Sequence, residues 1–184
     1  MPAQVSVFGL GYVGCVSAAC FAREGFDVVG VDVAASKVDL INRGQATIVE
    51  QGIGELVSSM AKAGRLRATQ SVAEAVRESD ISLLCVGTPS RSNGSLDLSY
   101  VARVAAQIGE ALVTKTTPHT VVIRSTVLPG TAHELVVPAL ERASGRKVGR
   151  DIFVASNPEF LREGTSIKDF YDPPFTLIGA DDPE

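Results

Sequence analysis

The chain has 184 residues, of which 45% are hydrophobic and 21% are charged, and its formal net charge at pH 7 is −4. A chain of this length and composition is typical of a globular domain that buries a core of its own. The negative charge and an aromatic content of only 5% argue against a nucleic-acid-binding surface, which needs basic residues and rings for base stacking.

Three features of the sequence bear on where the protein works. It contains no run of roughly 18 uninterrupted apolar residues, so we expect no membrane-spanning helix and no membrane partner. The N-terminus enters a strand pattern at once, without a basic segment ahead of it, so we expect no signal peptide. Cys15, Cys20 and Cys85 are odd in number and lack C-x-x-C spacing, which indicates reduced, structural thiols in a cytoplasmic protein.

Strand and helix patterns alternate along the whole chain. Strands are expected at residues 4–9, 27–32, 66–69, 81–86, 120–125, 151–156 and 175–180. Helices are expected at residues 12–24, 36–43, 55–63, 71–78 and 98–112, and from Thr131 onward with a kink at Pro138. Ser71 with Glu74, and Thr131 with Glu134, have the spacing of a capping box. The alternation predicts an α/β fold with a doubly wound parallel sheet, the Rossmann dinucleotide-binding fold.

The first strand is followed by Gly9-Leu10-Gly11-Tyr12-Val13-Gly14, a G-x-G-x-x-G loop that opens a helix. Gly9 allows the tight turn, Gly11 lets the backbone approach a pyrophosphate, and Gly14 lets helix and strand pack closely. Asp32 ends the second strand, where an acid binds the adenosine ribose and repels a 2′-phosphate. The context predicts NAD as the cofactor rather than NADP. Lys37 lies near the same ribose or is a solvated helix residue.

Polar residues also end three later strands, and the carboxyl ends of parallel strands meet at one crevice. Thr88 and Thr126 could reach the cofactor there, or could equally be turn and capping residues. The segment "SNPEFLREGT" at residues 156–165 carries Glu159 and Glu163, which topology places beside the nicotinamide end. The alternative is a pair of solvated acids one helical turn apart.

Six ordered motifs carry a resemblance to a known family: "FGLGYVG", "VDV…K…LINRG", "IVE", "CVGTPSRSNGSLDLSYV", "VVIRSTVLPGT" and "NPEFLREG". From Val5 to about Ile178 the chain resembles the nucleotide-sugar 6-dehydrogenases, and it is nearer to those that use GDP-mannose than to those that use UDP-glucose. In this family a C6 alcohol is oxidised twice, by two NAD molecules, to a carboxylate by way of a cysteine thioester. The resemblance implies NAD contacts at Tyr12, Val13, Asp32, Lys37, Thr88 and Thr126, sugar-nucleotide contacts at Phe160, Leu161, Arg162 and Glu163, and catalytic roles for Thr126, Glu159 and Glu163.

Departures from the family pattern matter as much. The family's nucleophile lies in a G-G-S-C-type motif, which this chain does not contain, so Cys15, Cys20 and Cys85 are expected to be core residues. We interpret residues 1–184 as the NAD-binding domain, with the central helix, catalytic cysteine and C-terminal domain expected beyond Glu184. The final "DDPE" has the form of a helix start that the chain does not continue. A homodimer is expected only for a longer version, and the chain alone is expected to be inactive.

Some residues keep a plain interpretation. Gln51 stands where the family often has proline, which leaves Glu50 as no more than a loop acid. His119 and His133 lack a third ligand nearby, so no metal site is predicted. Three functions remain open besides the leading one: a UDP-glucose 6-dehydrogenase domain, a free-standing NAD-binding module without catalysis, and a dehydrogenase of another substrate class on the same fold.

Overall fold

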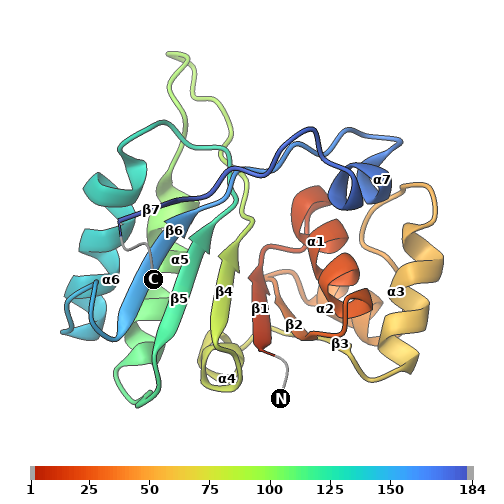
Figure 1. The fold of residues 1–184 in the computed structure, drawn as a ribbon, viewed down its shortest axis with the longest axis horizontal. Helices are drawn as coiled ribbons and strands as arrows, with labels where there is room; N and C mark the ends of the chain where they lie inside the picture. Colours follow the sequence, from red (N-terminus) through yellow and green to blue (C-terminus); the bar gives the residue numbers. More distant parts are fainter. Residues whose placement is uncertain (1–2, 182–184) are drawn as a thin grey trace.

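The computed structural model describes residues 3–181, which form a seven-stranded sheet with helices on both faces (Figure 1). The sheet order is β3-β2-β1-β4-β5-β6-β7, and only β7 runs antiparallel to its neighbour. The chain reverses its direction of travel across the sheet between β1 and β4, as in a doubly wound fold. The predicted fold class is therefore confirmed. The strands are β1 (Gln4–Phe8), β2 (Asp27–Val31), β3 (Leu66–Thr69), β4 (Ile81–Leu84), β5 (His119–Ile123), β6 (Ile152–Ser156) and β7 (Gly179–Ala180).

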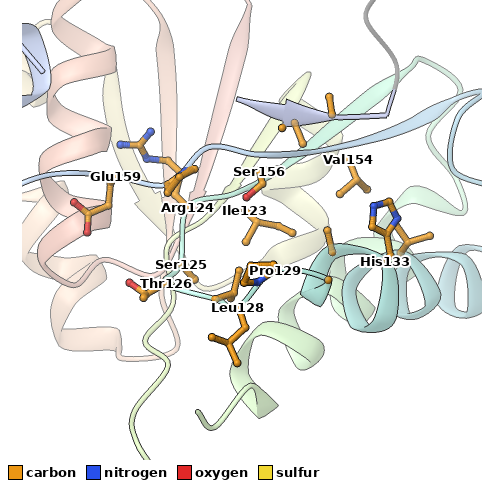
Figure 2. A pocket seen from close by; sticks show the side chains of 18 of the residues that line it. Ile123, Arg124, Ser125, Thr126, Leu128, Pro129, His133, Val154, Ser156 and Glu159 are labelled. Atoms are coloured by element: carbon orange, nitrogen blue, oxygen red, sulfur yellow. The ribbon is translucent and has the colours of Figure 1, made fainter. Parts of the chain in front are cut away.

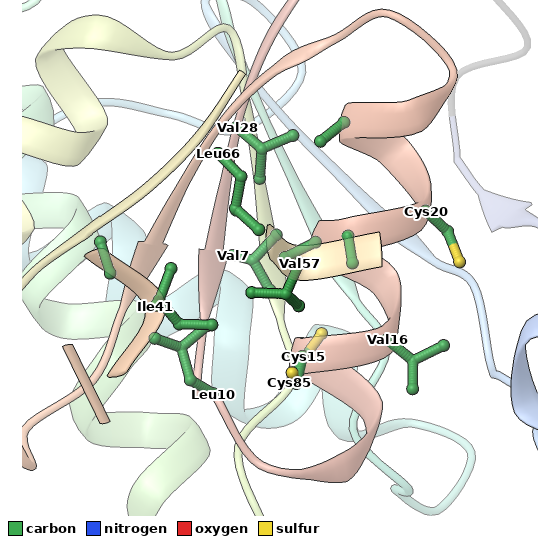
Figure 3. Close-up of a cluster of buried hydrophobic side chains, with 14 of the residues drawn as sticks. Val7, Leu10, Cys15, Val16, Cys20, Val28, Ile41, Val57, Leu66 and Cys85 are labelled. Atoms are coloured by element: carbon green, nitrogen blue, oxygen red, sulfur yellow. The ribbon is translucent and has the colours of Figure 1, made fainter. Parts of the chain in front are cut away.

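Two layers of helices cover the sheet, and each layer encloses its own apolar core. The first core packs α1, α2 and α3 against the sheet, and Figure 3 shows Val7, Leu10, Ile41 and Val57 meeting there. The second core packs α4, α5 and α6 on the opposite face. The strands β1, β2 and β4 are buried on both faces along most of their length, which explains why their sequences are mostly apolar. The helices are α1 (Tyr12–Arg23), α2 (Ala35–Asn42), α3 (Ile53–Lys62), α4 (Val72–Glu78), α5 (Ser99–Leu112), α6 (Val137–Ser144) and α7 (Ser166–Tyr171).

The helix preceding β6 differs from the one predicted. Ala132–Val136 is a π-helical segment, and Pro138 lies in the first turn of α6 directly after it. Proline has no N–H to donate at this point, and a widened turn accommodates its ring. The capping box predicted at Thr131 is wrong, because the Thr131 hydroxyl donates to the Leu128 carbonyl at 2.7 Å. Half of the capping box predicted at Ser71 forms: its hydroxyl accepts the Glu74 N–H at 3.2 Å, whereas its own N–H donates to the Thr69 hydroxyl at 3.1 Å.

The chain after β6 also departs from the prediction. Only Gly179–Ala180 of the expected strand at residues 175–180 pairs with the sheet, and Phe175, Leu177 and Ile178 are exposed. An apolar run predicts burial but does not specify which element covers it, so the sequence predicts a longer strand here than the structure has. Helix α7 was missed, because six residues show too little of the helical period to stand out. The helix start predicted at Asp182 to Glu184 lies outside the described residues.

A small, buried polar network lies within the sheet and involves residues of β1, β4 and β5. The Ser82 hydroxyl is 2.8 Å from Nε2 of His119 and 2.8 Å from the hydroxyl of Ser6. Nδ1 of His119 lies 3.1 Å from the Ser79 carbonyl, which can only accept, so Nδ1 carries the proton. Burial lowers the pKa of His119 to about 4, and the nearby Lys115 charge adds to the effect. His119 is thus a neutral core residue.

Candidate active site at the carboxyl ends of the strands

The glycine loop between β1 and α1 has the geometry that its sequence predicts. Gly9 has a φ of 96°, and a Cβ there would lie 2.8 Å from the Cys85 carbonyl oxygen. A Cβ at Gly14 would lie 1.7 Å from the Gly9 carbonyl oxygen, so a side chain there would displace the loop. A Cβ at Gly11, by contrast, would meet no heavy atom within 4 Å. The loop is therefore closed by Gly9 and Gly14 and open at Gly11, where α1 presents its N-terminal amides.

Asp32 ties this loop to the end of β2. Its carboxylate accepts the Leu10 N–H at 2.8 Å and the Ala34 N–H at 2.9 Å, and Lys37 Nζ lies 3.2 Å away. The side chain is only 8% exposed, so these partners replace the water that a carboxylate otherwise needs. A cavity of about 350 Å³ opens beside it and is lined by Gly9, Gly11, Asp32, Lys37, Tyr100 and Arg103, among others.

A second cavity, of about 610 Å³, lies at the carboxyl ends of β5 and β6. Figure 2 shows the side chains of Thr126 and Glu159 at one end of this cavity and that of His133 at the other. The hydroxyl of Thr88 donates to the Thr126 carbonyl at 2.7 Å, which joins the ends of β4 and β5. The structure therefore brings Thr88, Thr126 and Glu159 together, as the topology predicted.

The segment that follows β6 is held at its start by buried polar contacts. Arg124, at the end of β5, is 8% exposed, and its guanidinium donates to the Asn157 side-chain oxygen. The backbone N–H of Asn157 donates to the Ile123 carbonyl at 2.9 Å, which continues the ladder between β5 and β6. One Glu159 oxygen accepts the Leu161 N–H at 2.6 Å, so this acid turns the chain as well as facing the cavity.

Arg162 is bound within its own segment. Its guanidinium makes a two-point contact with Asp169, at 3.1 and 2.7 Å, and its N–H donates to the same carboxylate at 3.0 Å. The Thr165 hydroxyl adds a fourth donor at 2.9 Å. The Arg162 guanidinium, together with these donors, holds the pKa of Asp169 well below its usual range. This conformation leaves the Arg162 charge already paired.

Glu163 is not among the residues that line the cavity of Thr126 and Glu159, and its side chain is exposed. It lies instead near Tyr12. Burial raises the pKa of the Tyr12 hydroxyl, and the negative charges of Glu50 and Glu163 add to the rise. Phe160 lines the cavity and is 38% exposed, and its ring lies 4.7 Å from that of Phe175.

Glu50 has contacts in this region that the sequence did not predict. Its carboxylate accepts hydrogen bonds from the Tyr12 hydroxyl and from the backbone of Gly164, more than a hundred positions later. The tripeptide "IVE" gives no local signal of such a contact. Only the fold brings the two segments together.

The three thiols are buried, as expected. Burial raises the pKa of Cys20 to about 11 and that of Cys85 to about 12, so neither forms the thiolate that a nucleophile needs near neutral pH. Within residues 3–181, no group of three or more His, Cys, Asp or Glu side chains is placed to hold a metal ion. Among the helices in that range, none combines the length and apolar character needed to cross a membrane.

A doubly wound sheet with an open glycine loop at β1 and an acid at the end of β2 defines a dinucleotide-binding domain. The sequence matches, over residues 3–184, the NAD binding domain of the UDP-glucose/GDP-mannose dehydrogenase family. The chain belongs to this family, and it is the part of it that binds NAD. The predicted family and cofactor are both confirmed.

Individual relatives are similar over nearly the whole chain. The GDP-mannose 6-dehydrogenase of Azotobacter vinelandii is 57% identical over 96% of this chain and 40% of its own length. The UDP-glucose 6-dehydrogenase of Haloferax volcanii is 45% identical over 96% of the chain and 41% of its own length. A crystal structure of a ternary complex of GDP-mannose dehydrogenase from Pseudomonas aeruginosa has a TM-score of 0.96 and 51% identity, and covers 97% of this chain and 41% of that one. The chain therefore spans about 40% of the length of the relatives it matches.

Proposed function

We propose that this chain is the NAD-binding part of a GDP-mannose 6-dehydrogenase, which oxidises the C6 alcohol of the sugar to a carboxylate and so forms GDP-mannuronate. The observation that carries the proposal is the sequence identity: 57% with a relative named for GDP-mannose, against 45% with one named for UDP-glucose. The relatives are about 2.4 times as long as this chain, and the remaining length would supply the thiol nucleophile, the central helix and a dimer interface.

The glycine loop fits the cofactor. The open space at Gly11 supports the close approach of a pyrophosphate, and Asp32 with Lys37 would hold the adenosine ribose. Tyr12, Val13, Thr88 and Thr126 would contact the rest of the molecule, in line with the predicted set. When bound, NAD would supply the hydride acceptor for both oxidations, and these residues would hold it against the sugar.

Phe160, Leu161, Arg162 and Glu163 would line the sugar nucleotide. Because Asp169 already engages the Arg162 guanidinium, we assign Arg162 the role of shaping this segment rather than pairing with a phosphate. We assign Glu163 to positioning or deprotonating the water that cleaves the thioester. Glu159 would orient the site through its bond to the Leu161 amide, and Thr126 would face the sugar from the end of β5.

Turnover by a longer protein that contains residues 1–184 tests the proposal. Such a protein should reduce two NAD molecules for each GDP-mannose and should use UDP-glucose poorly, while the 184-residue chain alone should produce no NADH. A preference for UDP-glucose would favour the other branch of the family. Binding of NAD without turnover of any sugar nucleotide would favour a free-standing NAD-binding module.

Replacement of Glu163 tests its assigned role in the same longer protein. Glu163→Gln should slow hydrolysis by roughly a hundredfold or more, the usual contribution of a general base, and a covalent adduct should accumulate in intact-mass spectra. Glu110→Gln, an exposed acid in the last turn of α5, is the matched control and should behave as wild type. Wild-type turnover by Glu163→Gln, with no trapped adduct, would remove Glu163 from the mechanism.

A further inference from the structure

The backbone from Arg162 to Ser166, which we call the strap, is tied to a distant part of the chain. The Gly164 N–H donates to one Glu50 oxygen at 2.9 Å, and the Ser166 N–H donates to the other at 3.3 Å. The Tyr12 hydroxyl lies 3.0 Å from the Arg162 carbonyl. The strap is thus held by groups that precede it by more than a hundred residues.

The same carboxylate also contacts the first residue of α1. The Tyr12 hydroxyl donates to a Glu50 oxygen at 3.2 Å, so Glu50 lies between the strap and the start of the nucleotide-binding helix. The Gly164 N–H bond is the largest cause of a lowered Glu50 pKa, and the Ser166 and Tyr12 bonds lower it further. Glu50 is therefore ionised at neutral pH, and its carboxylate can accept the hydrogen bonds from Gly164, Ser166 and Tyr12.

The loop that carries Glu50 makes a second contact with the glycine loop. The hydroxyl of Thr47 donates to the Leu10 carbonyl at 2.7 Å, one residue before Gly11. The loop ends at Gly52, which has a φ of 75° and would place a Cβ 3.4 Å from the Ile167 side chain. Residues 47–52 thus span from the glycine loop on one side to α7 on the other.

We propose that Glu50 is a positioning residue that couples the strap to the glycine loop, so that a nucleotide bound at Gly11 steadies the segment that carries Glu163. Glu50 touches neither the cofactor nor the sugar in this assignment, which rests on the proposed function only for the role of Glu163. The local contact between Arg162 and Asp169 fixes the shape of the strap. Glu50 and Tyr12 fix its place against α1.

Hydrogen exchange of the 184-residue chain separates coupling from simple anchoring. An anchor would slow exchange in the strap equally with and without nucleotide, whereas a coupling residue makes the slowing depend on nucleotide. Saturating NAD should slow exchange in peptides covering residues 158–171 of wild type by about tenfold, the scale of one charge-assisted hydrogen bond. In Glu50→Ala the same peptides should exchange at one rate with and without NAD.

Two further variants complete the test. Glu55→Gln, an exposed acid in the first turn of α3, should keep the NAD-dependent slowing. Tyr12→Phe removes the hydroxyl that joins α1 to Glu50 and the strap but leaves the Thr47 contact and the Gly164 bond, so it should reduce the slowing, and it decides the question if Glu50→Ala fails to fold. All variants are compared at NAD concentrations that saturate each one. Nucleotide-dependent slowing that persists in Glu50→Ala, that is undiminished in Tyr12→Phe, or that is missing in wild type would overturn the proposal. The hydrogen-exchange experiment does not depend on turnover, so its result can be interpreted even if the dehydrogenase assignment is wrong.

Discussion

Gly11 and Gly14 separate the folding of the glycine loop from its ability to bind a nucleotide. They are three residues apart in the same loop, yet an added methyl group would have opposite consequences at the two positions. At Gly11 it would enter open space in front of α1, whereas at Gly14 it would lie 1.7 Å from the Gly9 carbonyl oxygen. We therefore expect Gly11→Ala to fold and bind NAD poorly, and Gly14→Ala to be destabilised.

The magnitudes follow from these contacts. Gly11 has a φ of −79°, which alanine adopts freely. Alanine lowers the conformational entropy of the unfolded chain, which stabilises the fold by about 0.4–1 kcal/mol. This gain offsets a loss of similar size, because alanine is a poorer N-cap residue than glycine. A methyl group in the space of the pyrophosphate would cost one or two charge-assisted hydrogen bonds, which is roughly a 10- to 100-fold weaker affinity for NAD. At Gly14 the clash involves backbone, which cannot rotate away, so we expect a loss of about 3 kcal/mol or more in the free energy of unfolding.

Urea unfolding and calorimetric titration of both variants measure the two quantities separately. Gly11→Ala should unfold at nearly the wild-type urea concentration and show the weakened affinity for NAD. Gly14→Ala should unfold at a clearly lower concentration. Wild-type affinity in Gly11→Ala would show that the pyrophosphate does not lie in front of α1, and wild-type stability in Gly14→Ala would refute the packing argument.

Two further predictions concern Asp32 and His119. Wild type should bind NAD well and NADP poorly. Asp32→Ala should weaken NAD binding by about 1–3 kcal/mol, because two ribose hydroxyls lose a charged acceptor. Calorimetry that finds equal affinities of wild type for NAD and NADP would contradict this prediction. For His119, the pKa in the folded protein is about 4, below the ordinary value of 6.5. Between these two pH values the unfolded chain binds a proton at His119 that the folded protein does not bind. The free energy of unfolding therefore falls as the pH decreases, by roughly 2 kcal/mol between pH 7 and 5. Urea unfolding at several pH values should show this slope in wild type and in the exposed-histidine variant His133→Gln but not in His119→Gln, and an unchanged slope in His119→Gln would rule out the assignment.

The sequence predicted the sheet because its pattern is local and repeated. Residues 4–8 and 27–31 are short, mostly apolar segments that each precede a turn, and four of the five residues in each are buried in the parallel sheet. The run at Phe175 to Ile178 looks the same in sequence and is exposed in the structure. The sequence pattern shows that these residues are apolar but not which part of the protein packs against them. For this reason the sequence predicts a longer strand than the two-residue β7.

In the candidate site, too, the sequence predicts the residues that follow a regular spacing and does not predict the others. Gly9, Gly11, Gly14 and Asp32 follow from spacing, because the turn between strand and helix and the neighbouring strand end fix where they meet. The pairing of Arg162 with Asp169 and that of Glu50 with the strap do not, since irregular backbone brings these residues together without any period. The roles of Thr126, Glu159 and Glu163 remain predictions.

The two-residue strand β7 has a consequence for how copies of this domain meet. It covers the outer edge of β6 at Ala155 and Ser156, while a single bridge from Val148 covers the start of the same strand at Ile152. At the opposite edge of the sheet, β3 is four residues long and carries Arg67, which is paired with Glu74 at 2.7 Å. Both borders of the described sheet are thus short, interrupted or charged, which disfavours growth of the sheet by addition of a strand from another molecule.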